Sequence, residues 1–308
     1  YSILDGQASI ARLVDKAMAN GMRGMTITDH GNMFGIKEFF NYVKKKNGAR
    51  RDKVKQTSAA IADLQAKVDA GEANDEQQTE LAKLKAEFDA LPKEDFKAII
   101  GCEVYVANRS RFDKQKGLDS YSHLVLLCKD YNGYKNLIKM VSLGFTEGFY
   151  SRPRVDRELL EKYHEGLVCC SACLGGEIPQ LIKSGNLEKA EESVMWFKNL
   201  FGEDYYLELQ LHKATVERAN HEVYPLQVEV NNHIIELSKK CGVKLICSND
   251  VHFVDEENAE AHDRLICLST GRDLDDPNRM LYSKQEWMKT KAEMWEMFSD
   301  IPEAMANT

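Results

Sequence analysis

Short apolar runs alternate with helix-length amphipathic segments along most of this chain, and this alternation limits the folds that the chain can adopt. The apolar runs cover residues 25–28, 98–106, 124–128, 167–171, 205–209 and 244–247. The amphipathic segments cover residues 8–19, 131–142, 187–200, 216–240 and 256–267. Such alternation predicts an α/β fold in which helices cover a largely parallel sheet. Six strands in this order are typical of a barrel or of a doubly wound sheet.

Residues 50–91 interrupt this alternation. They are rich in Ala, Lys, Glu and Gln, and their apolar side chains recur at helical spacing. These side chains are Ile61, Leu64, Val68, Leu81, Leu84, Phe88 and Leu91. Because residues 71–75 form a break and Pro92 a stop, the segment is predicted to be a helical hairpin inserted at 49–95, projecting into solvent rather than docking a partner. Apart from the hairpin, residues 1–270 are expected to form one domain, followed by a connector at 271–308.

Composition limits the functional classes. The chain has 308 residues, of which 43% are hydrophobic, and this is enough for one large core. No run of about eighteen apolar residues and no secretory start occur, so we expect a soluble cytoplasmic protein without a membrane span. The net charge of −8 argues against this segment being the main clamp on a nucleic-acid backbone. Processing of a nucleic acid that is held elsewhere remains compatible with this charge.

The eight cysteines are too sparse for a disulfide scaffold, and most of them lie in apolar runs, where a thiol packs as a small hydrophobic group. Cys170 and Cys173 form a C-x-x-C pair. A structural zinc site of that type needs a second pair at similar spacing, which the sequence lacks. Reduced thiols are therefore expected.

Polar groups occur at or near the ends of several predicted strands. Asp250 and His252 follow the last strand and are two residues apart, so an extended backbone turns both side chains to one side. His30 follows the first strand, at the edge where parallel sheets carry their active sites. Glu103 lies inside an apolar strand, where an unpaired charge costs several kcal/mol unless a cation or hydrogen bonds compensate.

His123, Cys173 and Asp5 also lie beside apolar runs. Each group alone has an ordinary explanation, as a hydrogen-bonded core histidine, a packing thiol or a turn residue. Strand ends meet in β/α folds, however, and the combined set offers the N, O and S ligands that suit Zn²⁺ or Mn²⁺. The set is Asp5, His30, Glu103, His123, Cys173, Asp250 and His252. It is large enough for two or three ions, and we predict catalytic roles for Glu103, Asp250 and His252.

Other side chains are weaker candidates. Asp29, Glu208 and His212 lie beside the expected ligands or at a similar strand end, and they are candidates for supporting them. Candidates for phosphate contacts are Arg152, Arg154 and Lys183, although isolated basic side chains are more often solvated. The remaining histidines are predicted to be surface or packing residues. They are His164, His221, His233 and His262.

These residues are part of a longer pattern of motifs. The motifs are YSILDG at 1–6, TDHGNMFG at 28–35, GCEVYV at 101–106, SHLVLL at 122–127, RPRVD at 152–156, NDVHFV at 249–254 and DPNR at 276–279. The pattern closely resembles the PHP (polymerase and histidinol phosphatase) domain of bacterial replicative DNA polymerases, over nearly the whole chain apart from the hairpin. The resemblance implies a distorted, TIM-like seven-stranded β/α barrel. Its first strand, with a His-x-His pair, would precede Tyr1.

The resemblance also implies a site with nine ligands for up to three ions, in which the seven residues above fill seven positions. Glu103 would bridge two ions, one of which is completed by His123 and Cys173. The ligands of the other ion would be Asp5, His30 and His252. The upstream His-x-His pair would join Glu103 and Asp250 on a third ion. Without that pair, weak or partial metal occupancy and poor activity are expected.

The function implied by the resemblance is metal-dependent phosphodiester hydrolysis. In the parent protein it would be a 3′→5′ exonuclease that proofreads the primer end of DNA, beside a polymerase core outside this chain and with other replicase subunits as partners. One alternative is a free-standing phosphatase for a small ester such as histidinol phosphate, which the long match disfavours. The other is a metal-stabilised scaffold that docks a separate proofreading subunit. Seven retained ligand types weigh against pure scaffolding, although metal binding alone does not prove turnover.

Overall fold

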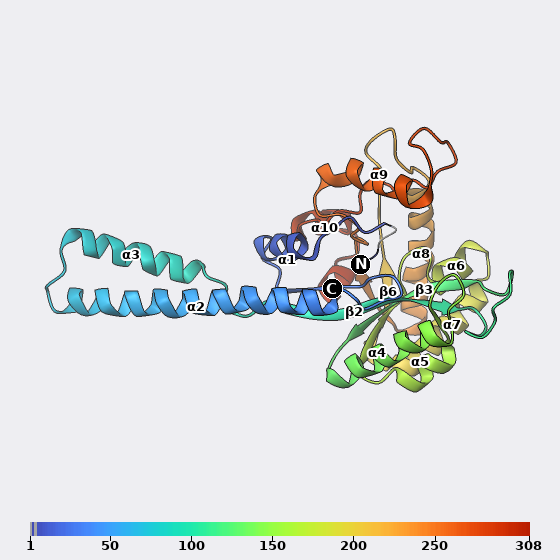
Figure 1. Cartoon of the computed structure of the whole chain (residues 1–308), viewed down its shortest axis with the longest axis horizontal. Coiled ribbons are helices and arrows are strands. Elements are labelled where there is room, and N and C mark those ends of the chain that lie inside the picture. Colours follow the sequence, from blue (N-terminus) through green and yellow to red (C-terminus); the bar gives the residue numbers. More distant parts are fainter. Residues whose placement is uncertain (1, 3–4) are drawn as a thin grey trace.

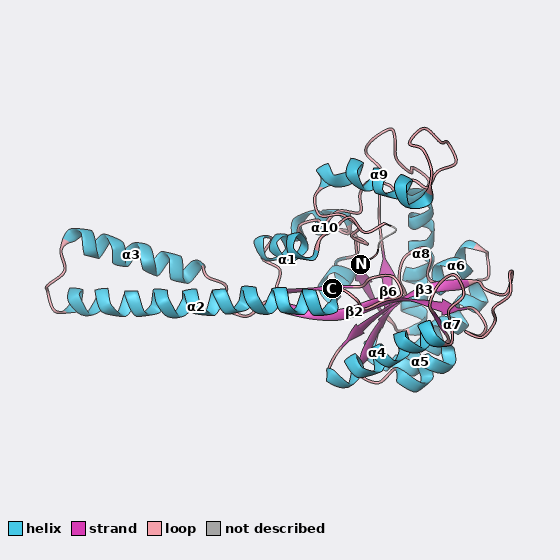
Figure 2. Ribbon diagram, in the orientation of Figure 1, coloured by secondary structure: helices cyan, strands magenta, loops and turns pink. Residues whose placement is uncertain are grey.

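The computed structural model describes residues 2 and 5–308, and seven strands of this part form one curled sheet. The strands are β1 (Gly24–Ile27), β2 (Lys97–Ala107), β3 (Tyr121–Cys128), β4 (Arg154–Val155), β5 (Leu167–Cys170), β6 (Tyr205–Leu209) and β7 (Lys244–Cys247). Their spatial order is β1-β2-β3-β5-β6-β7, with β4 paired to β2. Helices surround this sheet, so the predicted distorted α/β barrel class is confirmed (Figure 2).

The sheet is less parallel than expected. The pairs β1–β2, β2–β4, β5–β6 and β6–β7 are parallel, but β3 runs antiparallel to both β2 and β5. The connection from β2 to β3, residues 108–120, contains no helix. Parallel neighbours usually need a helical crossover, whereas antiparallel strands accept a loop. As a consequence, β3 begins at the edge where β2 ends.

Eleven α-helices are present in the described residues. They are α1 (Ile10–Ala19), α2 (Ile36–Asp69), α3 (Asp75–Ala90), α4 (Tyr131–Thr146), α5 (Arg157–Tyr163), α6 (Glu177–Lys183), α7 (Leu187–Phe201), α8 (Val223–Cys241), α9 (Ala259–Thr270), α10 (Lys291–Met297) and α11 (Pro302–Asn307). Two short 3-10 helices are η1 (Gly202–Asp204) and η2 (Glu256–Asn258). The helix expected from residue 216 begins only at Val223. Pro225 accounts for this start, because proline is tolerated only in the first turn of a helix.

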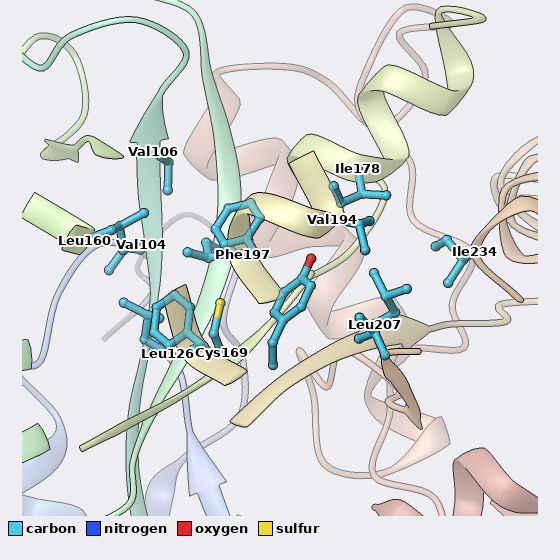
Figure 3. Packing of buried hydrophobic residues seen from close by; sticks show 14 of the residues in the cluster. Val104, Val106, Leu126, Leu160, Cys169, Ile178, Val194, Phe197, Leu207 and Ile234 are labelled. Carbon is cyan, nitrogen blue, oxygen red and sulfur yellow. The ribbon is translucent and has the colours of Figure 1, made fainter. Parts of the chain in front are cut away.

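Alternation along the strands separates the face of the sheet that packs against helices from the face that lines the cavity. Val104, Leu126, Cys169 and Leu207 point to the outer face and join the main hydrophobic core with helices α4 to α8 (Figure 3). The residues between them point inward, among them Glu103 on β2. Because successive side chains of a strand point to opposite faces, the packing that fixes the outer set also fixes the inner set.

A smaller core anchors the predicted hairpin. Ile36, Phe39 and Val43, one helical face of α2, pack against α1 and β1 in this core. Beyond that point α2 continues outward and α3 returns beside it, so the hairpin projects from the body as predicted (Figure 1). Its base is closed by the amide of Asn47, which donates to the carbonyl of Phe96 and accepts from its N–H, both at 2.9 Å. The hairpin is therefore an extension of a core helix.

Strands β1 and β7 are the two edges of the main sheet path in the described residues. A cavity of about 620 Å³ lies inside the curled sheet, lined in part by Thr26 of β1 and Ile246 of β7. The C-terminal residues cover the edge of β7, since the amide of Cys247 donates to Oγ1 of Thr308 at 3.0 Å. The strand expected before Tyr1 stays a prediction. None of the helices in the described part combines the length and apolar character that a membrane span requires.

Candidate metal centre

The seven predicted ligands come together at one end of the curled sheet. Glu103 and His123 lie on the neighbouring strands β2 and β3. The other five lie in the N-terminal segment or in loops after β1, β5 and β7. They are Asp5, His30, Cys173, Asp250 and His252. Because β3 is antiparallel, its first residues lie beside the C-terminal ends of its neighbours, which brings strand ends and strand starts into one site.

Glu103, His123 and Cys173 form a first group of ligand atoms. Oε1 of Glu103 lies 2.6 Å from Nδ1 of His123 and 4.0 Å from Sγ of Cys173. The same Sγ lies 3.6 Å from Nδ1 of His123. The amide of Gly175 donates to this sulfur at 3.4 Å and so orients it. One oxygen, one nitrogen and one sulfur therefore surround a common space.

Asp5, His30 and His252 form a second group, in which Oδ2 of Asp5 lies 3.6 Å from Nε2 of His30 and 3.8 Å from Nε2 of His252. Nδ1 of His30 lies 3.6 Å from Oε2 of Glu103. Glu103 thus directs one carboxylate oxygen to each group. A ligand that bridges two ions needs this arrangement, and the bridging role itself stays a prediction.

Gly31 allows the chain to turn directly after His30. Its φ is +64°, and a Cβ at this position would lie 2.9 Å from the ring of Tyr105 and from Pro153. Its amide donates to the carbonyl of Glu103 at 2.8 Å. Since only glycine avoids both the left-handed strain and the clash, Gly31 keeps His30 close to β2.

The donor set fits divalent cations. Within the described part of the chain, Oδ1 of Asp5 and Nδ1 of His30 are buried and have no hydrogen-bond partner. Leaving a buried polar atom unpaired costs about 1–3 kcal/mol, and a nearby cation would satisfy both atoms. The ligand atoms of Asp5, His30 and His252, and those of His30, Glu103 and His123, lie within 4.8 Å of one another. Carboxylate, imidazole and thiolate together suit Zn²⁺ or Mn²⁺.

Burial and charge shift the pKa values in this centre. Burial alone raises the pKa of Glu103, but the hydrogen bond from His123 and the charge of His30 outweigh it and hold that pKa below its ordinary value. Burial lowers the pKa of His123, whereas its hydrogen bond to Glu103 raises it, and the net change is a rise. Burial raises the pKa of the Cys173 thiol well above its usual range. A thiolate at this position therefore needs a cation beside it.

Asp250 is held in a strained backbone conformation. Its φ is +45°, in the left-handed region that non-glycine residues rarely adopt. The preceding residue is fixed by His212, whose Nε2 contacts the carbonyl of Asn249 at 3.1 Å. Oδ1 of Asp250 lies 3.9 Å from Nδ1 of His252, and its side chain lines the same cavity as Glu103. His212 therefore fixes the backbone beside Asp250.

Tyr282 and His262 contact the predicted ligands, although the sequence did not indicate either residue for this role. The hydroxyl of Tyr282 donates to Oδ2 of Asp5 at 3.0 Å and lies 3.4 Å from Nε2 of His252. Nε2 of His262 contacts the carbonyl of Asp5 at 2.8 Å. No local pattern marks Tyr282, since 277 residues separate it from Asp5. The segment 271–308 therefore contributes to the centre and is more than a connector.

Removing the hydroxyl of Tyr282 is expected to weaken metal binding. The Tyr282→Phe variant keeps the ring but loses the hydrogen bond that orients Asp5, so the affinity for Mn²⁺ should fall about tenfold, as for other partners of metal ligands. Isothermal titration calorimetry with Mn²⁺ measures this change. Tyr163→Phe, at the end of α5, is the control and should bind as the unchanged protein does. Equal affinities for both variants would contradict a supporting role for Tyr282.

Glu208 faces the same cavity from β6, outside the two ligand groups. Its carboxylate accepts hydrogen bonds from Ser248 and from Nε2 of Gln210, the latter at 3.0 Å. Burial raises the pKa of Glu208 to about 7, although both hydrogen bonds oppose the rise. Glu208 therefore carries a proton at mildly acid pH.

The raised pKa of Glu208 makes stability depend on pH. The folded protein keeps a proton that the unfolded chain loses between pH 4.5 and about 7, so stability falls as the pH rises through this window. The contribution is about 3 kcal/mol. We expect Glu208→Gln to remove this loss when unfolding by guanidinium chloride is compared at pH 5 and pH 8 in EDTA. Glu203→Gln, an exposed control, should keep the loss, and a similar loss in both variants would show that the pKa of Glu208 is ordinary.

The three basic residues that are candidates for phosphate contacts lie in different environments. Arg152 has its guanidinium 5.9 Å from the ring centre of Tyr105, and that ring contacts those of His30 and His123. Arg154 is fully buried and donates to the carbonyls of Gly148 and Asp113, so it holds these loops and has no access to a phosphate. Lys183 is exposed and donates to the carbonyl of Leu174 at 3.3 Å. Only Arg152 therefore keeps the geometry expected of a phosphate contact near the centre.

Asp29 anchors the N-terminal segment. Its carboxylate accepts a hydrogen bond from Oγ of Ser2 at 2.9 Å, and the same hydroxyl accepts from the amide of His30 at 3.2 Å. The carbonyl of Asp29 accepts from the amide of Glu103 at 3.2 Å. Asp29 therefore fixes the backbone around two of the predicted ligands, His30 and Glu103.

Comparison with known proteins gives consistent results. The model of the PHP domain family matches residues 1–212. Over its whole length the chain is 38% identical to the DNA polymerase III subunit alpha of Borreliella burgdorferi and 34% identical to that of Chlamydia muridarum. Over 99% of its length it is 34% identical to the subunit of Thermus aquaticus. The chain spans about a fifth of these relatives, at 22%, 23% and 20% of their lengths. Because the family model covers more than half of it, the chain belongs to the PHP domain family.

Proposed function

We propose that this chain is the metal-dependent phosphoesterase domain of a DNA polymerase III alpha subunit and acts as a 3′→5′ exonuclease on DNA. The observation that carries the proposal is the carboxylate of Glu103, which lies between two groups of metal-ligand side chains. The relatives are named as subunits of a DNA polymerase, and the chain matches about a fifth of their length. Zn²⁺ or Mn²⁺ is the proposed cofactor.

The residues of the chain divide the proposed work. The carboxylates of Asp5 and Glu103 would bind the cations that neutralise the negative charge of a phosphodiester. The neighbouring imidazoles would be further ligands of these cations. Divalent ions held there would supply an activated water and stabilise the charge of the displaced oxygen. Arg152, beside Tyr105, is proposed to bind a phosphate of the substrate. The catalytic roles assigned to Glu103, Asp250 and His252 are part of this proposal.

The acidic charge of the chain also fits a domain that receives DNA from elsewhere. A net charge of −8 provides little attraction for a phosphate backbone. We therefore propose that the primer end is delivered by a polymerase core in the same cytoplasmic protein, together with other replicase subunits.

A mismatch assay with the full-length polymerase subunit tests this function. The substrate is primed DNA with a 3′-terminal mismatch, and release of the last nucleotide is followed with Mn²⁺ and with EDTA. We expect metal-dependent release that falls at least about tenfold in Asp250→Asn, which keeps the side-chain shape but removes the charge. Equal release by the variant and the unchanged protein would refute the exonuclease proposal.

One observation favours a second candidate, a metal-stabilised scaffold. The ligands join segments that are far apart in the sequence, from Asp5 to His252, so bound ions would tie the N-terminal segment to the sheet. A scaffold would lose thermal stability in EDTA while showing no nucleotide release with Mn²⁺. The free-standing phosphatase gains no support from the relatives, which are named as polymerase subunits.

A further inference from the structure

Three phenylalanine rings lie exposed beside one another close to the candidate metal centre. Phe34 follows β1, Phe145 lies in the last turn of α4, and Phe149 follows that helix. Their exposed fractions are 66%, 37% and 49%. The ring centres of Phe34 and Phe145 are 5.9 Å apart, and those of Phe145 and Phe149 are 6.3 Å apart. Exposed rings gathered in this way are typical of a binding surface.

The rings are inclined by small angles. The planes of Phe145 and Phe149 meet at 20°, and those of Phe34 and Phe145 at 35°. Rings of the hydrophobic core also stack, as Phe197 and Tyr205 do at 19°, so the exposure of these three rings is what distinguishes them. Aromatic rings that are exposed to solvent can receive another flat group, such as a nucleic-acid base.

The three rings connect to the centre through both of their loops. Phe34 lies four residues after His30, and Asn32 fixes this turn by donating to the carbonyl of His30 and accepting from the amide of Phe34, both at 3.1 Å. On the other side, Phe149 lies three residues before Arg152, whose guanidinium is above Tyr105. Both loops that carry the rings therefore lead within a few residues to side chains at or beside the centre.

Tyr105 is buried beside the centre and contacts the rings of His30 and His123. The ring of Tyr105 is nearly parallel to that of His30, at 14°, with centres 6.1 Å apart. Arg152 forms no ion pair with any carboxylate of the described residues, so its charge is available to a ligand. By contrast, Arg111 is paired with Asp156 and Glu147. An uncompensated guanidinium beside Tyr105, three residues after Phe149, is suited to a phosphate that joins two stacked bases.

We propose that Phe34, Phe145 and Phe149 form a stacking platform for unpaired bases at the end of a single-stranded nucleic acid, with Arg152 on the phosphate nearest the centre. This proposal rests on the proposed exonuclease function, since it names how the strand reaches the site. Aromatic rings with a neighbouring cation are the usual means of binding single strands without sequence preference. The position beside the centre favours a strand over a protein as the occupant.

Photo-cross-linking on the full-length protein tests the platform without any need for hydrolysis. The probe is a single-stranded DNA oligonucleotide that carries 5-iodouracil at the second or third position from its 3′ end, irradiated in EDTA. We expect adducts on the peptides that contain Phe34, Phe145 or Phe149. Adducts found only in other parts of the protein would overturn the proposal. If adducts form on these peptides but no nucleotide is ever released, the exonuclease proposal fails while the platform stands.

Kinetics and footprinting give two further outcomes. With an active protein, Phe34→Leu and Phe145→Leu should each raise the KM for single-stranded DNA about 5- to 100-fold, the range for loss of one stacked base, with kcat within about twofold. Phe40→Leu, which changes an exposed ring of α2 outside the platform, should leave both constants unchanged. An unchanged KM in the platform variants overturns the proposal. So does protection of Phe34 and Phe145 from hydroxyl radicals in the DNA-free protein, because a protein surface would then cover them.

Discussion

Glu103→Gln is expected to abolish tight metal binding and, with it, nucleotide release. The substitution keeps the size of the side chain but removes the charge that faces His123 on one side and His30 on the other. Loss of a side chain that only hydrogen-bonds to a metal ligand lowers the metal affinity about 10- to 100-fold. Loss of the shared carboxylate should therefore lower Mn²⁺ affinity and the rate of mismatch removal by about 10³-fold. Calorimetric titration and the mismatch assay measure the two effects.

Glu208→Gln is the matched control for this variant. Glu208 is also a buried carboxyl group that faces the cavity, but it lies outside both ligand groups. The affinity of the control for Mn²⁺ should stay within about threefold of that of the unchanged protein. This change is smaller than the one expected when a side chain that hydrogen-bonds to a metal ligand is lost. Thermal unfolding in EDTA shows whether each variant folds. If folded Glu103→Gln bound metal as tightly as the control, the shared role of this carboxylate would be wrong.

Arg279→Ala is expected to destabilise the fold by about 3–5 kcal/mol, the range for breaking a buried ion pair. Nη1 and Nη2 of its guanidinium both donate to the carboxylate of Asp263, with Nη2 and Oδ2 at 2.8 Å, and both residues are buried. Without Arg279, the nearest basic group to Asp263 is Lys284, at 3.9 Å. Unfolding by guanidinium chloride in EDTA measures the change in the free energy of unfolding.

Arg272→Ala serves as the comparison, because Arg272 also pairs with an aspartate, Asp276, but 54% of its side chain is exposed. An exposed pair contributes less than about 1 kcal/mol, so this variant should unfold almost as the unchanged chain does. Similar small effects of both substitutions would indicate that residues 271–308 fold independently of the body. A large effect of Arg279→Ala alone shows that this segment is an integral part of the domain.

Features with a local cause were predictable from the sequence. The bounds of β6 and β7 agree with the apolar runs at 205–209 and 244–247, because buried strands require continuous apolar residues. Glu103 was recognisable as unusual because a charge inside such a run needs a compensating partner. The helical spacing of residues 61–91 was sufficient for the hairpin, since a solvated pair of helices depends mainly on its own pattern.

Features that depend on distant parts of the chain were not predictable in this way. The antiparallel direction of β3 follows from how its connection crosses the sheet, and an apolar run has the same pattern in either direction. Tyr282 belongs to a polar segment that was expected to be a connector, and its contact with Asp5 spans 277 residues. The strained φ of Asp250 depends on Asn249 and His212, which only the folded chain brings together. Each of these features requires tertiary packing that no local pattern specifies.

Anomalous X-ray diffraction from crystals grown with excess Mn²⁺ tests most directly whether these side chains hold metal. We predict one peak between Glu103, His123 and Cys173, and a second peak among three other ligands. These ligands are Asp5, His30 and His252. The absence of both peaks, with Mn²⁺ bound only at exposed carboxylates elsewhere, would contradict the metal centre and the function proposed for it.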